Sequence, residues 1–255
     1  MEHPDVYLEE RDGIAILRMN RPPANAFTLE FARRFAAVLD HAREIKARAL
    51  VVTGSGNFFS GGLDLRVVPE YSSEEQRAFL GVLNRVIGAL YACPCPVVAA
   101  VNGHAIAGAF VVALTADYRV GPLGQAEFGL TEARVGIPFP AVPAVVVKAE
   151  LAPADLRYTA LYAKNFGPDE AVRRGLLDEL QPPENVLDRA IDVANDLASM
   201  PAAGYARVKQ QFRAGAIAEI EELNAKQSDP MLDSWVSAGA TEASSSTLSK
   251  SRSDS

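Results

Sequence analysis

Two glycine-containing turns and one glutamate carry the chemistry that this sequence can support. The first turn is Gly61-Gly62-Leu63, and the second opens at Gly108, which heads an expected helix over 109–114. Glycine at such points lets a ligand approach the backbone where N–H groups have no partner. Two turns of this kind can aim two N–H donors at one oxygen atom, as an oxyanion hole requires. Glu132, which follows on the same stretch of chain, is the candidate general base.

Two other motifs are incomplete. Gly54-Ser55-Gly56 comes after a strand-like segment, but Phe59 stands where a dinucleotide-binding fingerprint needs its third glycine. Ser60 lacks the glycine two residues earlier that a nucleophile elbow requires. The sequence therefore favours neither a dinucleotide site nor a serine hydrolase.

Histidine and cysteine show no metal-ligand spacing. The three histidines are scattered, and only His104 lies close enough to the second turn to be a candidate for the wall of the site. The two cysteines lie together in Cys93-Pro94-Cys95-Pro96, with no second cluster to complete a metal site. This segment is expected to be the entry into a strand. We expect no metal and no bound cofactor.

Composition limits the partners. The chain has 255 residues, 49% of them apolar, so it can bury a full core, and its net charge of −7 offers no basic surplus for nucleic acid. The longest strongly apolar run, 105–116, is too short to cross a bilayer. The acidic, polar start resembles neither a secretory signal nor a transit peptide. We expect a cytoplasmic protein with no nucleic-acid or membrane partner.

The periodicity of the apolar residues predicts an α/β front followed by a helical back. Expected strands cover 6–10, 14–19, 49–53, 97–101 and 117–120, and the first two form a hairpin. Expected helices cover 28–43 and 72–91, capped by Thr28 and by Ser72 or Ser73. From Pro138 onward only helices are expected, near 141–150, 153–163, 168–175, 184–199, 202–213 and 216–235, with an interruption at Gly215.

Taken as a set and in this order, four segments resemble the crotonase family, also called the enoyl-CoA hydratase/isomerase superfamily. They are RPPANAF (21–27), FFSGGLDL (58–65), NGHAIAGAFVVALTADYRV (102–120) and FGLTEARVGIP (128–138). The resemblance covers roughly residues 5–235. It implies a substrate that is an acyl-CoA thioester, so that coenzyme A belongs to the substrate and no separate cofactor is needed.

The resemblance also implies an α/β fold built as a spiral of β-β-α units with a helical C-terminal region. On this basis we expect a core over 1–200, a helical trimerisation region over 201–236 and a disordered serine-rich tail over 237–255. The expected assembly is a homotrimer or a dimer of trimers. The isolated Trp235 is a candidate for docking on another element or subunit.

Residue by residue, the resemblance places the two oxyanion donors on the backbone N–H groups of Leu63 and Gly108, and the base on Glu132. Asp64 is expected to brace its turn, since short acids favour such turns. Arg21 and Lys209 are candidates for binding the CoA phosphates. The residues expected to contact the substrate are Ala24, Asn25, Ala26, Gly61, Gly62, Asp64, Leu65 and Thr131.

One departure from the family pattern bears on the reaction. The family's hydratases carry two glutamates, and the first of these positions is Val111 here, while the second is Glu132. Adding water across a double bond needs two acid–base groups, whereas moving a proton from one carbon to another needs one. The sequence therefore resembles the Δ3,Δ2-enoyl-CoA isomerase branch most closely. The apolar neighbours Phe128, Leu130, Val135 and Ile137 are expected to raise the pKa of Glu132.

Several alternatives stay open at this stage. Family members with one carboxylate also include decarboxylases, hydrolases and enzymes that form carbon–carbon bonds. A non-catalytic acyl-CoA binder would keep the two turns as a cradle. An assembly protein acting through Trp235 and the C-terminal helices would have no affinity for CoA.

Overall fold

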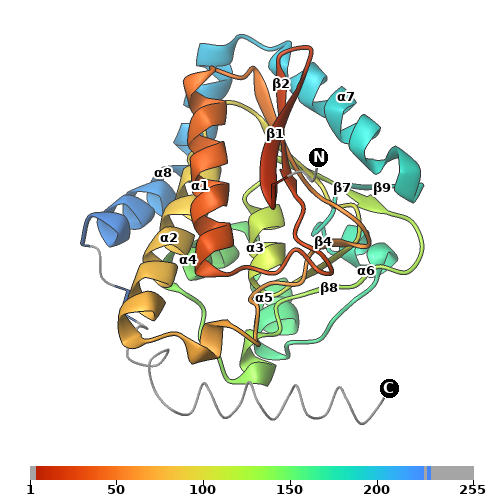
Figure 1. The fold of residues 1–255 in the computed structure, drawn as a ribbon. Helices are drawn as coiled ribbons and strands as arrows, with labels where there is room; N and C mark the ends of the chain where they lie inside the picture. Colours follow the sequence, from red (N-terminus) through yellow and green to blue (C-terminus); the bar gives the residue numbers. More distant parts are fainter. Residues whose placement is uncertain (1–3, 227–228, 231–255) are drawn as a thin grey trace.

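The computed structural model describes residues 4–226 and 229–230 (Figure 1). Its main sheet has six strands in the order β1-β2-β3-β5-β7-β9. Only β1 and β2 are antiparallel, and the other neighbours are parallel. The strands are β1 (Val6–Arg11), β2 (Ile14–Met19), β3 (Ala49–Gly54), β5 (Val97–Ala100), β7 (Tyr118–Pro122) and β9 (Glu179–Gln181).

A second, parallel sheet of three short strands lies below the first: β4 (Phe58–Ser60), β6 (His104–Ile106) and β8 (Phe128–Gly129). Each strand of this sheet directly follows a strand of the main sheet, and a helix comes next. The chain thus repeats a β-β-α unit that advances from β3-β4-α2 to β5-β6-α3 and β7-β8-α4. This confirms the predicted spiral. It also brings the three strand ends of the small sheet to one place.

The helices of the described chain are α1 (Leu29–Glu44), α2 (Ser73–Tyr91), α3 (Gly108–Leu114), α4 (Ala141–Glu150), α5 (Pro153–Leu156), α6 (Pro168–Arg173), α7 (Val186–Ala198) and α8 (Ala202–Lys226). Short 3₁₀ turns occur at η1 (Val68–Glu70), η2 (Glu132–Val135) and η4 (Pro183–Asn185), and a π-helical turn η3 covers Arg157–Leu161. None of the described helices combines the length and the apolar character needed to cross a bilayer.

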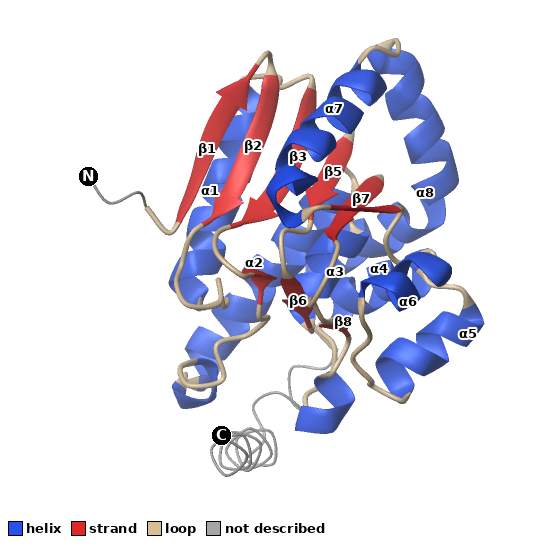
Figure 2. Cartoon of the chain, turned by 90° about the vertical axis from the view of Figure 1, so that its right-hand side faces the viewer, coloured by secondary structure: helices blue, strands red, loops and turns tan. Residues whose placement is uncertain are grey.

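The main sheet is covered on both faces, which explains its continuous apolar runs. On β2, Ile14 and Ile16 pack on the side of α7, while Ala15 and Leu17 pack on the opposite side, in the cluster that contains α1 and α2. All four residues are fully buried. Figure 2 shows α7 across one face of the sheet and α1 behind the other.

The helix starts agree with the sequence. The Thr28 hydroxyl accepts a hydrogen bond from the N–H of Phe31, and Ser72 forms a capping box with Glu75. Such caps satisfy N–H groups that the first helical turn leaves open.

The structure corrects three expectations about the elements. Strands β4, β6, β8 and β9 were not expected, because two or three residues are too few to show a period of two. The expectation that strands end at Pro138 is wrong, since β9 pairs with β7. The interruption at Gly215 is also wrong: α8 runs through it as one helix. Trp235 and the serine-rich tail lie outside the described residues.

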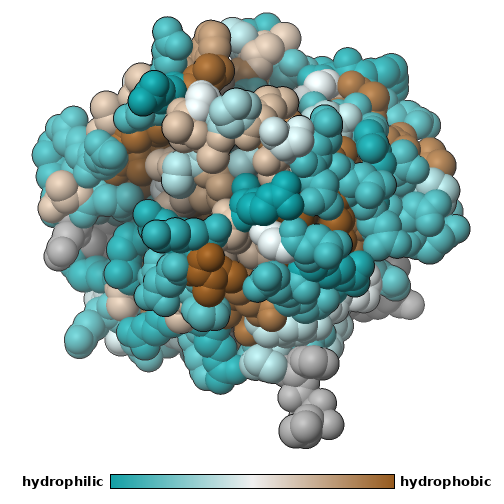
Figure 3. All heavy atoms as spheres, turned by 90° about the horizontal axis from the view of Figure 1, so that it is seen from above, coloured by the Kyte–Doolittle hydropathy of each residue, from teal (hydrophilic) through white to brown (hydrophobic). Residues whose placement is uncertain are grey.

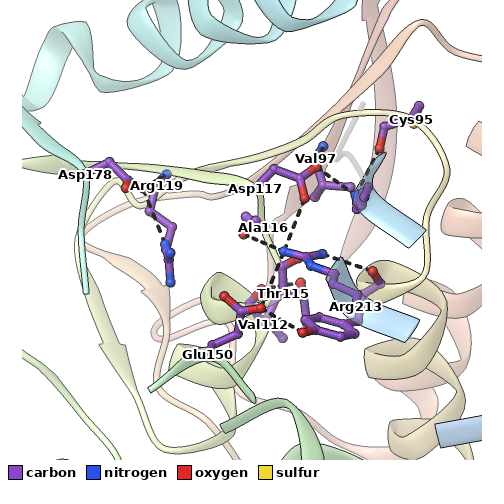
Figure 4. A network of polar contacts seen from close by, with 12 residues as sticks. Cys95, Val97, Val112, Thr115, Ala116, Asp117, Arg119, Glu150, Asp178 and Arg213 are labelled. Carbon is purple, nitrogen blue, oxygen red and sulfur yellow. Dashed lines mark hydrogen bonds and ion pairs between the residues drawn. The ribbon is translucent and has the colours of Figure 1, made fainter. Parts of the chain in front are cut away.

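A group of largely buried charges attaches α8 to the core before Gly215, a residue type that costs about 1 kcal/mol in a helix interior. The Asp117 carboxylate, at the start of β7, lies 2.7 Å from the Lys209 ammonium and 3.2 Å from the Arg213 guanidinium, both on α8 (Figure 4). Arg213 also donates to the carbonyl oxygens of Tyr91 and Thr115 and lies 3.6 Å from the Glu150 carboxylate. These contacts fix the first half of α8 on the core.

The second half of α8 is held by a close apolar contact with α2. Ile220 is buried against Gly88 of α2, where a Cβ atom would come within 2.7 Å of the isoleucine.

Lys209 is only 7% exposed and ion-paired, so the structure contradicts its suggested role in binding a CoA phosphate. Assembly into trimers through 201–236 stays a prediction.

We expect Asp117→Asn to lower the free energy of unfolding by about 3 kcal/mol, because Lys209 and Arg213 would lose their shared buried counter-charge. Urea denaturation measures this. The matched control is Glu222→Gln on the same helix, whose ion pair with Lys226 is well exposed and should contribute less than about 0.5 kcal/mol. Equal small changes in both variants would show that the charge cluster does not hold α8.

Candidate active site

A pocket of about 150 Å³ opens where the ends of the small sheet meet α2, α3 and the start of α4. Its described wall is almost wholly apolar, with Thr131 and Glu132 as the polar side chains. The lining residues are Phe27, Gly61, Gly62, Leu63, Leu65, Leu83, Val86, Ile87, Ile106, Ala107, Gly108, Val112, Thr131, Glu132, Val135, Ile137, Pro140 and Pro143.

In the first turn, hydrogen bonds of neighbouring residues hold Leu63 in place, while the N–H group of Leu63 itself has no acceptor. The Phe27 N–H donates to the carbonyl oxygen of Gly62 at 2.7 Å, and the Asp64 N–H donates to the carbonyl oxygen of Phe27 at 3.0 Å. Leu63 therefore forms a parallel bridge with Phe27. Within the described chain its N–H has no hydrogen-bond acceptor, so it remains available to a ligand.

The second turn presents the Gly108 N–H in the same way. Ala107 has a positive φ of 56°, a conformation that costs an alanine about 1–3 kcal/mol and persists only where the surroundings enforce it. Its N–H donates to the carbonyl oxygen of Gly129 at 2.7 Å, which ties the turn to β8. The Gly108 N–H starts α3 and has no acceptor among the described residues.

The two turns are in direct contact at Gly62. This glycine has a φ of +82°, and a Cβ atom added there would lie 2.7 Å from the carbonyl oxygen of Ile106 and 3.7 Å from the nitrogen of Gly108. Glycine is thus required twice, once for the backbone angle and once for the close approach. The consequence is that two residues with open N–H donors, Leu63 and Gly108, line the same pocket.

The polar side chains of Asn25, Ser60 and Asn102 shape the first turn from behind, and those of Asn25 and Ser60 are buried. The Asn25 amide donates to the carbonyl oxygens of Ser55 and Phe58, and Asn102 accepts from the Gly54 N–H and donates to the Gly56 carbonyl oxygen. Ser60 donates to the Asn25 carbonyl oxygen and accepts from Gly62. The sequence suggested turns at these points but not this bracing, because all of these partners except Ser60 and Gly62 are 30 to 48 residues apart along the chain.

Arg21 and Asp64 brace the same turn from the outer side. The Arg21 guanidinium lies 2.9 Å from the Asp64 carboxylate and also donates to the Ala26 carbonyl oxygen. The predicted bracing role of Asp64 is consistent with this pair. These contacts hold Arg21 at the turn, and its suggested role on a CoA phosphate stays a prediction.

Glu132 is the ionisable side chain of the pocket. It opens the 3₁₀ turn η2, is only 6% exposed, and its Oε2 atom is buried without a hydrogen-bond partner among the described residues. Burial in apolar surroundings raises the pKa of this carboxyl from its ordinary 4.5 to about 8. A carboxylate that binds a proton this tightly, without a partner of its own, suits a group that exchanges protons with a ligand.

The structure brings most of the predicted site residues together. Those that line the pocket are Gly61, Gly62, Leu63, Leu65, Gly108, Thr131 and Glu132. Ala24, Asn25, Ala26 and Asp64 stand behind it and are not part of its wall. For Asn25, which is buried at 1% exposure, the structure shows a bracing role rather than a surface that a substrate could touch.

Three residues near the site add no ionisable group to the pocket wall. His104 accepts a hydrogen bond from the Glu127 N–H, stacks on Phe58 and does not line the pocket. Val111 is fully buried in the core, whereas Val112 faces the pocket. Neither valine supplies an ionisable group.

Sequence reasoning missed the wall that α2 contributes. Leu83, Val86 and Ile87 lie at helical spacing on one face of this helix and line the pocket. The spacing showed a buried face, but nothing in it separates a core contact from a pocket wall. Beside this face, Asn84 and the Ala141 N–H both donate to the Asp229 carboxylate, which ties α2 to the start of α4.

The described residues contain no group of three or more His, Cys, Asp or Glu side chains that could hold a metal ion.

The site thus combines a spiral of β-β-α units, two backbone N–H groups without an acceptor and one buried glutamate in an apolar pocket. The family model for enoyl-CoA hydratase/isomerase matches residues 9–246, so the chain belongs to this family. A probable enoyl-CoA hydratase of Rhodobacter capsulatus is 32% identical over 216 residues, which cover 84% of this chain and 83% of that protein.

Solved structures agree with the family. An enoyl-CoA isomerase of Mycobacterium tuberculosis superposes with a TM-score of 0.80 at 28% identity, covering 88% of this chain and 97% of that one. The human mitochondrial Δ3-Δ2-enoyl-CoA isomerase superposes with a TM-score of 0.88, covering 98% and 99%, and at 23% identity it supports the fold alone.

We expect Gly62→Ala to lower kcat/KM by at least about 100-fold, because the added methyl would push the turn at Ile106 away and separate the two N–H donors. Steady-state kinetics with an acyl-CoA that the wild-type protein converts measures this change. The control is Gly56→Ala, which has a similar φ of +73° but nothing within 4 Å of its Cβ position. If both variants lose activity equally, the backbone angle and not the contact between the turns is responsible.

We expect Glu132→Gln to stabilise the protein at high pH. The pKa of Glu132 is about 8 in the folded protein and 4.5 in the unfolded chain. Between these pH values the folded wild type keeps a proton that the unfolded chain has released. The free energy of unfolding of the wild type therefore falls as pH rises through this window. The cost is on the order of 5 kcal/mol above pH 8. Denaturation at pH 5 and pH 9 should show near-equal stabilities at pH 5 and a more stable variant at pH 9. A constant difference would contradict the raised pKa.

Proposed function

We propose that this protein isomerises a 3-enoyl-CoA to the trans-2-enoyl-CoA. The observation that carries the proposal is that Glu132 is the single ionisable side chain lining the described pocket, and that it shares this pocket with the open N–H groups of Leu63 and Gly108. Moving a proton between two carbons needs one acid–base group, whereas hydration needs a second to manage the water.

The mechanism follows from this arrangement. The thioester oxygen accepts hydrogen bonds from the Leu63 and Gly108 N–H groups. Glu132, in its ionised form, removes a proton from C2 and leaves a dienolate whose charge is spread onto the thioester oxygen. The protonated Glu132 then returns the proton to C4, and the double bond moves into conjugation with the thioester.

Magnitudes support backbone catalysis here. Each preorganised N–H donor in a water-excluded site is worth about 3 kcal/mol of the barrier. The raised pKa of Glu132 makes the carboxylate a stronger base toward carbon, at the cost of a smaller ionised fraction at neutral pH. The apolar residues of α2 on the pocket wall suit an aliphatic acyl chain.

Hydration of a 2-enoyl-CoA is the second candidate, and the names of relatives favour it. Besides the Rhodobacter protein, a short-chain-enoyl-CoA hydratase of Clostridium acetobutylicum is 29% identical over 90% of this chain. Names do not decide between the two, since one structure of the Mycobacterium tuberculosis protein is described as a probable hydratase and another as an isomerase. Against hydration stand Val111 and the lack of a second acid on the described pocket wall.

The test follows the absorbance of the conjugated thioester with a 3-enoyl-CoA and, separately, with a 2-enoyl-CoA. We expect the signal to rise with the 3-enoyl substrate and to stay flat with the 2-enoyl substrate. Glu132→Gln should lower the rate by about 1,000-fold or more, because its amide cannot take the proton. The matched control Glu127→Gln changes an exposed glutamate outside the pocket and should leave the rate unchanged.

The pH profile adds a second criterion. If Glu132 must be ionised to act, kcat/KM should rise with pH around an apparent pKa of about 8 rather than near 4.5. Loss of the 2-enoyl signal would favour hydration. Binding of CoA esters without turnover of either substrate would favour another one-carboxylate reaction or a non-catalytic binder.

A further inference from the structure

Two cysteines separated by one proline lie between the end of α2 and the start of β5. The Sγ atoms of Cys93 and Cys95 are 3.3 Å apart and hydrogen-bonded, and neither forms a disulfide. A disulfide bond is about 2.05 Å long, so the two sulfur atoms need to approach by only about 1.2 Å to form one. They are the only cysteines of the chain.

Both residues line a second cavity, of about 790 Å³, which is separate from the catalytic pocket. Its walls come from the end of α1, from 93–96 and from the junction of α7 and α8. Figure 3 shows the molecule from the top of the view in Figure 1. Hydrophobic patches alternate with hydrophilic side chains on this face. Cys93 is buried and Cys95 is partly exposed. A small solute can therefore reach the pair without entering the catalytic pocket.

The surroundings favour one thiolate beside one thiol. The hydrogen bond from Cys95 lowers the pKa of Cys93 below its ordinary 9; burial opposes this, and the nearby Lys209 ammonium assists it. The pKa of Cys95 is raised, chiefly because its thiol donates to Cys93. Lys209 also donates to the Cys95 carbonyl oxygen at 3.2 Å (Figure 4). A reactive thiolate next to a retained thiol is the arrangement in which one sulfur attacks and the other resolves.

We propose that Cys93 and Cys95 form a peroxide-oxidisable dithiol, a modification site apart from the catalytic pocket. One thiolate attacks hydrogen peroxide: an S–O bond forms, the O–O bond breaks, and the leaving hydroxide takes up a proton to become water. The neighbouring thiol then attacks the sulfenic sulfur, forming the S–S bond and releasing a second water. In total, two thiols and one hydrogen peroxide give one disulfide and two waters, with both sulfurs oxidised and the peroxide reduced.

The full chain, treated with one equivalent of hydrogen peroxide at neutral pH, provides the test. We expect both thiols to disappear together, the intact mass to fall by two hydrogen atoms, and dithiothreitol to restore both. The chains should stay unlinked on a non-reducing gel. The rate should exceed that of glutathione by about tenfold, since a larger fraction of the pair is thiolate.

Two variants separate the steps. Cys93→Ser and Cys95→Ser should each abolish the internal bond, and at least one should accumulate a sulfenic acid that dimedone traps. Neither residue lines the catalytic pocket, so unchanged turnover of the acyl-CoA substrate would show that the variants are folded. A wild-type mass that gains oxygen without losing two hydrogens, disulfides only between chains, or thiols that react no faster than glutathione would overturn the proposal. If a variant fails to fold, the wild-type mass and gel still decide.

Discussion

The contact between two backbone turns is the constraint on which the site depends. Gly62 packs against the Ile106–Gly108 turn so closely that no side chain fits between them, and this contact places the N–H groups of Leu63 and Gly108 on one pocket. Neither turn could do this alone. The small sheet β4-β6-β8 exists at this point because each β-β-α unit of the spiral delivers one short strand and one turn to the same level.

The price of this arrangement is visible at two residues. Ala107 holds a positive φ that an alanine adopts only under constraint, and Glu132 holds a carboxyl whose ionisation is opposed by burial. Both features lower the stability of the folded protein beside the pocket, and the rest of the fold offsets them. The side-chain amides of Asn25 and Asn102 fix the first turn, and the hydrogen bond from Ala107 to Gly129 fixes the second.

Two further features, a charge cluster and the cysteine pair, lie away from the pocket. Asp117, Lys209 and Arg213 hold α8 on the core as one charge cluster, and the same lysine reaches the carbonyl oxygen of Cys95. The cysteine pair therefore sits at the attachment point of α8, opening on its own cavity. The cavity beside the thiols and the pocket that holds Glu132 are separate, because none of the described residues lines both.

The sequence was enough to predict the long helices and strands and the helix caps at Thr28 and Ser72. It also showed the candidate groups of the site, which are two glycine turns and Glu132. These depend on local spacing and residue type, which a linear pattern records. It could not show the strands of two or three residues, the passage of α8 through Gly215, or the commitment of Arg21, Asn25 and Lys209 to bracing. Those were decided by tertiary structure, because burial and the partner that a polar side chain finds depend on contacts between residues far apart in the chain.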